Sequence, residues 1–408
     1  MNVEITIPGA DALGRVFLTW TPVEATAQIL NPVGDRPIRV TLRNAGSEGR
    51  VRFATTRTHL GTPTLALALP VDGTAVRFFV AGEFGRPSVS VGDAVIQARR
   101  TGTTTVLGRK PVTVRVRKNA QTLSPAERDR FVAAFGTLNG GGAGRFRDFR
   151  DMHVSAATDE GHGDVGFLPW HRAYLLDLER ELQAIDPSVA LPYWRFDQAA
   201  PNVFTREFMG VSNAVGTVEF TAGHPFNTWR TDGALGISRS PRFATGSAPG
   251  ALLTETQTLA LGGAAPNADY GGFTGMELDP HGRAHGRFRG FLRVISSAPR
   301  DPLFFMLHAN VDRLWAKWQW ANKRTDPAEA RAFAPSNRVG HRIPDTMWPW
   351  NGVTAAPRPS TAPGGTFPPS RSTTQPGLRP KVGAMIDHQA VSGGPPLAFA
   401  YDDVPFEL

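Results

Sequence analysis

Six of the ten histidines in this 408-residue chain fall into two sets of three. The first set is His153, His162 and His171, and the second is His281, His285 and His308. In the second set, His281 and His285 are four residues apart, so on a helix their rings leave the same face. His308 follows on another predicted helix, seven residues after the N-cap residue Asp301. Two packed helices would bring these three ring nitrogens together, which predicts a helical fold around a metal.

The first set is spaced differently along the chain. His153 ends a predicted helix over 145–153, and His171 begins the next one. His162 lies in the glycine-rich link between these two helices. The sequence therefore predicts a second three-nitrogen site, with one of its ligands on a loop.

The residue types in both sets limit the choice of metal. Cysteine is absent, which excludes disulfides and thiolate metal sites. Magnesium and calcium prefer oxygen ligands, and three histidines can bind a catalytic zinc ion, so zinc is an alternative for one site. Two three-histidine sites in one chain favour copper, which imidazole suits. The reading of these histidines as unrelated packing or surface residues is weak, because both triads coincide with predicted helices.

The chain divides near residue 108 into a strand-rich part and a helix-rich part. About eight short β-rich runs, separated by glycine, proline, aspartate and asparagine, fill residues 1–108. This pattern predicts an all-β immunoglobulin-like sandwich as an accessory domain. Residues 109–408 are expected to form a mainly α catalytic domain.

Capping residues mark the helices of the second part. Ser124-Pro125-Ala126-Glu127 is a capping box that predicts a helix to about Leu138. The helix that begins at His171 should end at Asp186-Pro187, and Asp279-Pro280 and Asp301-Pro302 should start two more. Residues 351–377 are rich in proline, threonine, serine and glycine, which predicts a long ordered loop or a mobile flap.

Charge and hydropathy narrow the classes of partner. The net charge is +8, but the basic residues are mostly arginine scattered along the chain, whereas nucleic-acid binders gather them on one face. We therefore expect no nucleic-acid partner. No apolar run is long enough to span a membrane and the N-terminus does not resemble a secretory signal. A cytoplasmic location is expected by default, with export by another route as the alternative, and the oligomeric state is not indicated.

Residues 111–408 resemble the type 3 copper proteins, the superfamily of tyrosinases, catechol oxidases and haemocyanins. His162-Gly-Asp-Val-Gly-Phe-Leu-Pro-Trp-His171 resembles the first copper signature of that family, and Leu191-Pro-Tyr-Trp194 resembles its LPYW segment. Glu277-Leu-Asp-Pro-His281-Gly-Arg-Ala-His285 and the stretch from Asp301 to Trp315 resemble the segments around the second copper. The resemblance implies a four-helix bundle with a dinuclear centre of two copper ions, each held by one triad, and O2 as co-substrate.

The chain departs from the family pattern at several points. Leu307 stands where relatives often have a further histidine, and His308 matches the usual ligand. Many relatives link a cysteine to the residue that matches His162, so without cysteine His162 is expected to be free of that bond and more mobile. Phe399-Ala-Tyr401 resembles the motif that closes the catalytic domain of relatives, and no shielding domain is expected after it. Shielding of the copper site would fall to residues 1–108, with a packing, solubility or oligomerisation module as the alternative.

The resemblance also implies roles around the copper pair. Glu277 matches a glutamate that holds a water over the centre and could take a phenol proton. A first-turn glutamate favoured by the helix dipole is the alternative. Gly282 stands where efficient monophenol hydroxylases often have asparagine, Gly286 would leave the entrance open, and Ile295 matches a residue that gates the substrate pocket.

Two further side chains are expected to support the ligands. Asp312 could accept a hydrogen bond from a ligand imidazole, and pairing with a nearby arginine is an equal alternative. Phe304 lies one turn before His308 and should pack against a ligand ring. The three other histidines of this part match no ligand position; they are His224, His341 and His388.

Together these features predict a copper-dependent polyphenol oxidase that converts o-diphenols to o-quinones with O2. Hydroxylation of monophenols, as in tyrosinases, is a further activity to be tested. A haemocyanin-like oxygen carrier and an o-aminophenol oxidase are the alternatives, and the small residues Gly282 and Gly286 argue against the blocked pocket of a carrier. The expected partners are small phenolic substrates.

Overall fold

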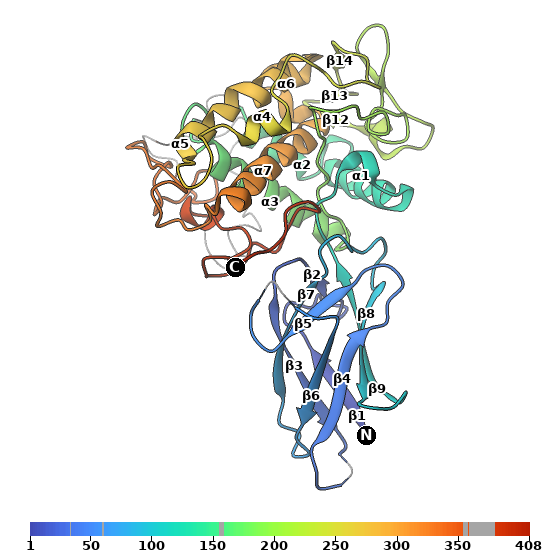
Figure 1. Cartoon of the computed structure of the whole chain (residues 1–408). Helices are drawn as coiled ribbons and strands as arrows, with labels where there is room; N and C mark the ends of the chain where they lie inside the picture. Colours follow the sequence, from blue (N-terminus) through green and yellow to red (C-terminus); the bar gives the residue numbers. More distant parts are fainter. Residues whose placement is uncertain (33, 59–60, 155–158, 354–357, 359–379) are drawn as a thin grey trace. The chain divides into compact units, whose positions relative to one another are not determined.

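The computed structural model describes the chain except for residues 33, 59–60, 155–158, 354–357 and 359–379 (Figure 1). The loop or flap predicted over 351–377 falls mostly on the last two ranges and lies outside the described residues. The chain forms two compact units: one comprises Met1–Val116 with Gln389–Leu408, and the other comprises Arg117–His388. No described helix combines the length and hydropathy that crossing a membrane requires.

The first unit is built from strands, as predicted for this part of the chain. Its strands are β1 (Asn2–Thr6), β2 (Phe17–Leu18), β3 (Val23–Leu30), β4 (Ile38–Asn44), β5 (Val51–Ala54), β6 (Thr64–Leu69), β7 (Val76–Gly82), β8 (Ala94–Arg100) and β9 (Val106–Val114). One sheet has the order β1-β3-β7-β5 and the other the order β2-β9-β8-β4-β6. All pairs are antiparallel except β2 with β9. The immunoglobulin-like assignment stays a prediction.

Alternating side chains give this unit its core. In β1, Val3 and Ile5 are buried and their neighbours are exposed, as expected for a strand with one face on a core. Val3 and Phe78 from the first sheet share one apolar cluster with Leu42 and Ile96 from the second. The β-rich prediction therefore holds, because both sheets bury one face in a common interior.

The segment Gln389–Leu408 is part of this unit although it lies at the other end of the sequence. Trp20 donates its indole N–H to the carbonyl of Tyr401 at 2.8 Å. Phe406 is buried in the same apolar cluster as the strands, and the Arg57 guanidinium lies 5.1 Å from the centre of its ring. The unit therefore uses two separate stretches of chain.

The boundary expected at residue 108 falls inside a strand. β9 continues through Gly108, with Arg109 opposite Gln97 and Lys110 opposite Ile96 in β8. The division by compactness lies between residues 116 and 117 instead, with a second division after residue 388. Glycine and proline within β9 are strand-breaking residue types, which explains why the sequence pattern favoured a link there.

The second unit is helical. Its helices are α1 (Pro125–Asn139), α2 (Phe146–Met152), α3 (Phe167–Ile185), α4 (Glu255–Leu259), α5 (Tyr270–Phe273), α6 (Arg283–Gly286) and α7 (Leu303–Asn322). A π-helical turn, Leu278–Gly282, precedes α6. Short 3-10 turns lie at Ala120–Thr122, Gly140–Gly142, Pro225–Thr228, Thr274–Glu277, Phe291–Arg293, Ala298–Arg300 and Gly383–Met385. The unit also has three small antiparallel strand pairs: β10 (Val211–Ser212) with β11 (Val218–Glu219), β12 (Arg230–Thr231) with β13 (Ala234–Leu235), and β14 (Arg239–Pro241) with β15 (Phe288–Gly290).

The predicted helix signals match the long helices, except that α3 begins at Phe167, four residues before the predicted start at His171. Ser124 and Glu127 form the reciprocal capping box at the start of α1, and Gly140 ends it with a φ of 53°. α3 ends at Ile185, before Asp186-Pro187. The segment from Asp279 is a π turn followed by the short α6, not one regular helix. The four-helix bundle therefore stays a prediction, while the helical character of this unit is confirmed.

Candidate metal centre

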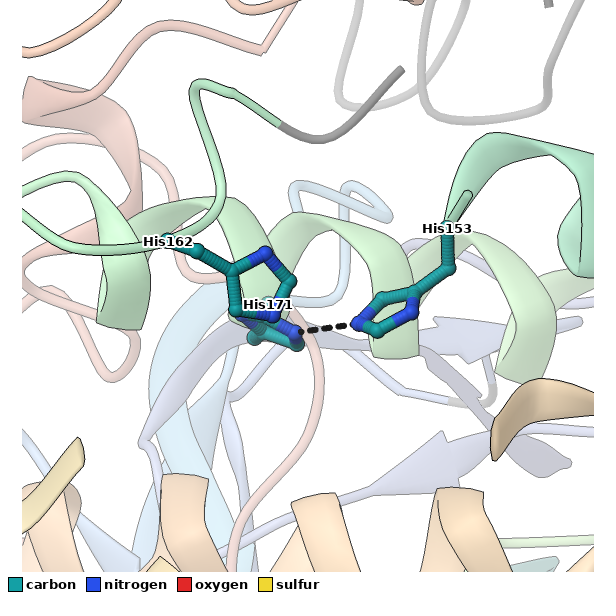
Figure 2. A group of neighbouring side chains, drawn as sticks. All are labelled: His153, His162 and His171. Carbon is teal, nitrogen blue, oxygen red and sulfur yellow. Dashed lines mark hydrogen bonds between the residues drawn. The ribbon is translucent and has the colours of Figure 1, made fainter. Parts of the chain in front are cut away.

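All six histidines predicted as metal ligands come together in the helical unit. His153 caps the C-terminal end of α2, and His171 lies one turn inside α3. His281 belongs to the π turn, His285 to α6 and His308 to α7. His162 alone lies neither in a helix nor at a helix cap. Within each triad the ring nitrogens lie within 4.8 Å of one another, and Figure 2 shows the three rings of the first triad converging.

Backbone carbonyls fix the orientation of most of these rings. Nδ1 lies at hydrogen-bond distance from a carbonyl oxygen in four of them: His153 to Ile295 at 3.1 Å, His171 to Phe167 at 2.9 Å, His281 to Glu277 at 2.7 Å and His285 to Leu292 at 2.6 Å. A carbonyl can only accept, so Nδ1 carries the proton in each ring. The lone pair is therefore on Nε2, which points into the centre.

The distances between facing Nε2 atoms show whether a metal ion fits between them. Nε2 of His153 and His171 are 3.2 Å apart, and Nε2 of His308 lies 3.2 Å from those of His281 and His285. In the His153–His171 pair both Nε2 atoms carry lone pairs, which repel each other at this distance and cannot form a hydrogen bond. A shared cation removes the repulsion, and nitrogens ~2.0–2.1 Å from one ion lie about 3 Å apart. The residues present fit a metal bound by each triad.

Burial keeps the rings neutral, as metal binding requires. Desolvation, aided by the neighbouring histidines, holds the pKa of His153, His171, His281 and His308 well below its usual value. Burial lowers the pKa of His285 to about 4. Imidazoles that stay unprotonated at neutral pH leave their Nε2 lone pairs free for metal ions.

The two triads form one centre. The rings of His171 and His308 are stacked with centroids 4.3 Å apart and an interplanar angle of 13°. Phe304 packs against both triads, 4.7 Å from the ring of His153 and 4.2 Å from that of His308. Phe304 thus has the packing role that its spacing predicts. The arrangement places two metal sites next to each other.

Asp312 has charged partners from two other segments. Its carboxylate accepts from Arg172 Nε at 2.5 Å and from Arg117 Nη1 at 3.0 Å, and all three side chains are buried. Arg117 also pairs with Glu179 at 2.8 Å. Of the two roles considered for Asp312, the structure displays the pairing with arginine. This network ties α3 to α7, the helices that carry His171 and His308.

A pocket of about 690 Å³ opens over the centre. It reaches both half-exposed ligands, His162 and His285, and its walls include Glu277, Gly282 and Ile295. Its size is ordinary for a small-molecule site. Gly286 is not among the lining residues, although a Cβ at this position would meet no atom within 4 Å.

Glu277 is a carboxylate in the wall of this pocket. Its Oε1 accepts from the backbone N–H of Gly163 at 2.8 Å. Burial, aided by the charge of Asp164, raises the pKa of Glu277 to about 7, although the Gly163 N–H opposes this. A carboxyl with such a pKa can exchange a proton at neutral pH.

Several functional contacts were not predicted from the sequence. The carbonyls of Ile295 and Leu292 fix His153 and His285, and any residue type could supply them. His341 accepts a hydrogen bond from the backbone N–H of Gly166, beside α3. Nothing in the motifs marks His341, because its partner is a backbone N–H, which every residue except proline supplies.

Known proteins resemble this chain over the same region. The family model for the common central domain of tyrosinase matches residues 143–321, which include all six histidines. A tyrosinase of Streptomyces glaucescens is 34% identical over 268 residues, covering 59% of this chain and 94% of that protein. A tyrosinase of Streptomyces lincolnensis is 32% identical over 263 residues, covering 58% and 92%. A solved polyphenol oxidase variant from Thermothelomyces thermophila aligns with a TM-score of 0.47 at 21% identity, covering 72% of this chain and 88% of that one.

Proposed function

Because the chain belongs to the tyrosinase family of type 3 copper oxidoreductases, we propose that it oxidises o-diphenols to o-quinones with O2. In the balanced reaction two diphenols each lose two protons and two electrons, and one O2 becomes two waters. The observation that carries the proposal is the pocket over two adjacent histidine triads, with Glu277 in its wall. A small phenol can reach the centre through this opening.

The residues of the chain bind, orient and deprotonate the phenol in this proposal. The two triads hold the copper ions, which when bound supply the redox chemistry and the binding of O2. The half-exposed ring of His285 offers a surface on which the phenol ring stacks, beside Ile295. Glu277 lines the same pocket and takes a phenol proton as general base.

Three alternatives differ in what they require of this pocket. Hydroxylation of monophenols needs an ordered water near Glu277, and Gly282 has no side chain to hold one. An oxygen carrier needs a blocked pocket, whereas the described residues leave an open one of about 690 Å³. An o-aminophenol oxidase would use the same centre, and only the substrate distinguishes it from a diphenol oxidase.

Turnover of matched substrates tests the proposal. The copper-loaded protein would be given catechol, the corresponding monophenol and o-aminophenol, with product absorbance and O2 uptake recorded together. We expect catechol to be the fastest substrate, with one O2 consumed per two quinones. Reversible O2 binding without product would favour the carrier, and faster turnover of o-aminophenol would favour the third alternative. Copper content at two per chain is the control for loading.

A further inference from the structure

His162 is the one predicted ligand whose backbone is not held by a helix. The other five lie in or directly cap helical turns, whose hydrogen bonds fix their position. His162 instead lies in the link between α2 and α3 and is half-exposed. The chain contains no cysteine, so no thioether can tether this ring. A ligand on a loop weakens metal binding unless other contacts hold the loop in place.

The described part of this link, 159–166, is held by a distant segment of the same unit. Gly166 lies four residues after His162, and its backbone N–H donates to His341 Nδ1 at 3.0 Å. The carboxylate of Glu160, two residues before His162, accepts from the backbone N–H of Trp348 at 3.0 Å. Glu160 also pairs with Arg358. Contacts to His341, Trp348 and Arg358 therefore lie on both sides of the ligand.

These contacts are buried and closely packed. His341 is fully buried and Glu160 is 5% exposed. A Cβ on Gly166 would lie 2.6 Å from His341 Nδ1, so only glycine permits this approach. Gly340 has a φ of 85°, and a Cβ there would lie 2.3 Å from Glu160 Oε2. Because these two glycines have no Cβ, the loop and the segment around His341 can pack directly against each other.

The tautomer of His341 follows from this geometry. Its Nδ1 accepts from an N–H, so the ring is neutral with its proton on Nε2, and burial favours this form by lowering the pKa. An acceptor at this position is what Gly166 requires. A side chain of similar shape without an acceptor would leave the Gly166 N–H buried and unsatisfied.

We propose that His341, together with Glu160, is a positioning residue that holds the His162 loop in the geometry needed to bind the first copper. His341 does not touch the metal; it acts through Gly166 and the loop. The inference rests on the assignment of the first triad to copper but not on the substrate. Loss of one of two bound coppers is therefore its readout, separate from turnover of any phenol.

Copper retention in the full-length chain tests this role. Copper-loaded protein would be dialysed against increasing concentrations of a chelator, and copper per chain measured by elemental analysis. In His341→Phe we expect one of the two ions to bind about 10–100-fold more weakly and the other to be unchanged. His341→Asn should retain both ions, because Asn Oδ1 can accept where Nδ1 did. Adding His341→Phe to His162→Ala should weaken binding of the first ion no more than His162→Ala does alone.

His224 provides a matched control. It is also buried, and its Nδ1 accepts from the backbone N–H of Phe226 at 3.1 Å, away from the loop. His224→Phe loses the same kind of bond and should keep both coppers at wild-type affinity. The proposal is overturned if His341→Phe retains both ions normally, or if it weakens both equally. Should His341→Phe fail to fold, His341→Leu, which also lacks an acceptor, replaces it: copper affinity equal to that of His341→Asn would then overturn the proposal.

Discussion

Glu277 can be tested with a substitution that keeps its structural contact. In Glu277→Gln the amide oxygen can still accept from the Gly163 N–H, so the loop that carries His162 should be unaffected. The amide cannot take a proton, and we expect kcat for catechol to fall by about 10²-fold or more. The measurement is steady-state turnover at equal copper content. Unchanged kcat in a variant with two coppers would rule out Glu277 as the general base.

Gly282 is expected to limit monophenol hydroxylation. It has helical φ and ψ angles, so asparagine can adopt its backbone conformation. A Cβ there would lie 3.3 Å from the carbonyl of Glu277, which requires only a shift of a few tenths of an ångström. Gly282→Asn should raise the ratio of monophenol to diphenol turnover. Gly282→Ala, which adds the Cβ without the amide, is the control and should leave the ratio unchanged.

We expect His388 to contribute to the decrease in the free energy of unfolding at acid pH. Burial, with the charges of Arg172 and Arg117, holds the pKa of His388 well below the usual 6.5. The unfolded chain therefore binds the proton first, and the free energy of unfolding should fall as pH drops below about 6.5, by about 1.4 kcal/mol per pH unit for this residue. Denaturant unfolding of wild type and His388→Gln between pH 7.5 and 5 measures the difference. Parallel curves for the two proteins would contradict the prediction.

The sequence predicted the gathering of six histidines but not what orients them. Histidines at metal-binding spacings, beside residues that cap helices, can be recognised from the residue types alone. The carbonyls of Ile295 and Leu292 have no such signal, because every residue supplies a carbonyl and only the folded backbone aims it. For the same reason His341 could not be assigned: its partner is the backbone N–H of Gly166, 175 residues away.

The contact between α3 and α7 depends on buried charges as well as apolar packing. Asp312 on α7 pairs with Arg172 on α3 and with Arg117, and none of these side chains is more than 2% exposed. Asp312→Asn would leave the Arg172 charge without its carboxylate. We expect a loss of about 3–5 kcal/mol in the free energy of unfolding, as for other broken buried ion pairs.

An exposed ion pair of the same unit gives the control for this prediction. Arg206 and Glu219 pair at 2.5 Å, but their side chains are 53% and 41% exposed. Glu219→Gln should therefore cost about 0–1 kcal/mol. Both variants would be compared by denaturant unfolding at constant copper content. Similar losses in the two variants would mean that the buried network does not tie the helices together.

Helices with complete capping signals were predicted well, and irregular segments were not. Ser124 and Glu127 determine the start of α1 by local hydrogen bonds, so the sequence is sufficient there. The π turn at Leu278–Gly282 has no local signature that separates it from an ordinary helix start at Asp279-Pro280. β9 was not predicted as a strand, because its glycine and proline disfavour one and its pairing with β8 is not visible in a single sequence.

The β-rich unit is not a simple N-terminal attachment. The segment Gln389–Leu408 supplies Phe406 to its core and the Tyr401 carbonyl to Trp20, so the chain enters and leaves the helical unit once each. The basic stretch at Gly108-Arg109-Lys110 is paired in β9, which protects it from proteases while the unit is folded. One cut there would not release the unit. A test of whether it shields the copper site must therefore destabilise the unit within the intact chain.

Phe78→Ala is suited to that purpose. Phe78 is fully buried in β7, and removing its ring should cost the β-rich unit about 3–5 kcal/mol while leaving the helical unit intact. Cleavage by trypsin at Arg109 or Lys110 would report that β9 has opened, and two retained coppers would report that the metal centre is whole. If the unit shields the pocket, catechol turnover of the uncut Phe78→Ala chain should be several-fold higher than that of wild type. Equal turnover of the two proteins, at equal copper content and with β9 open to trypsin in the variant, would instead identify the unit as a packing, solubility or oligomerisation module.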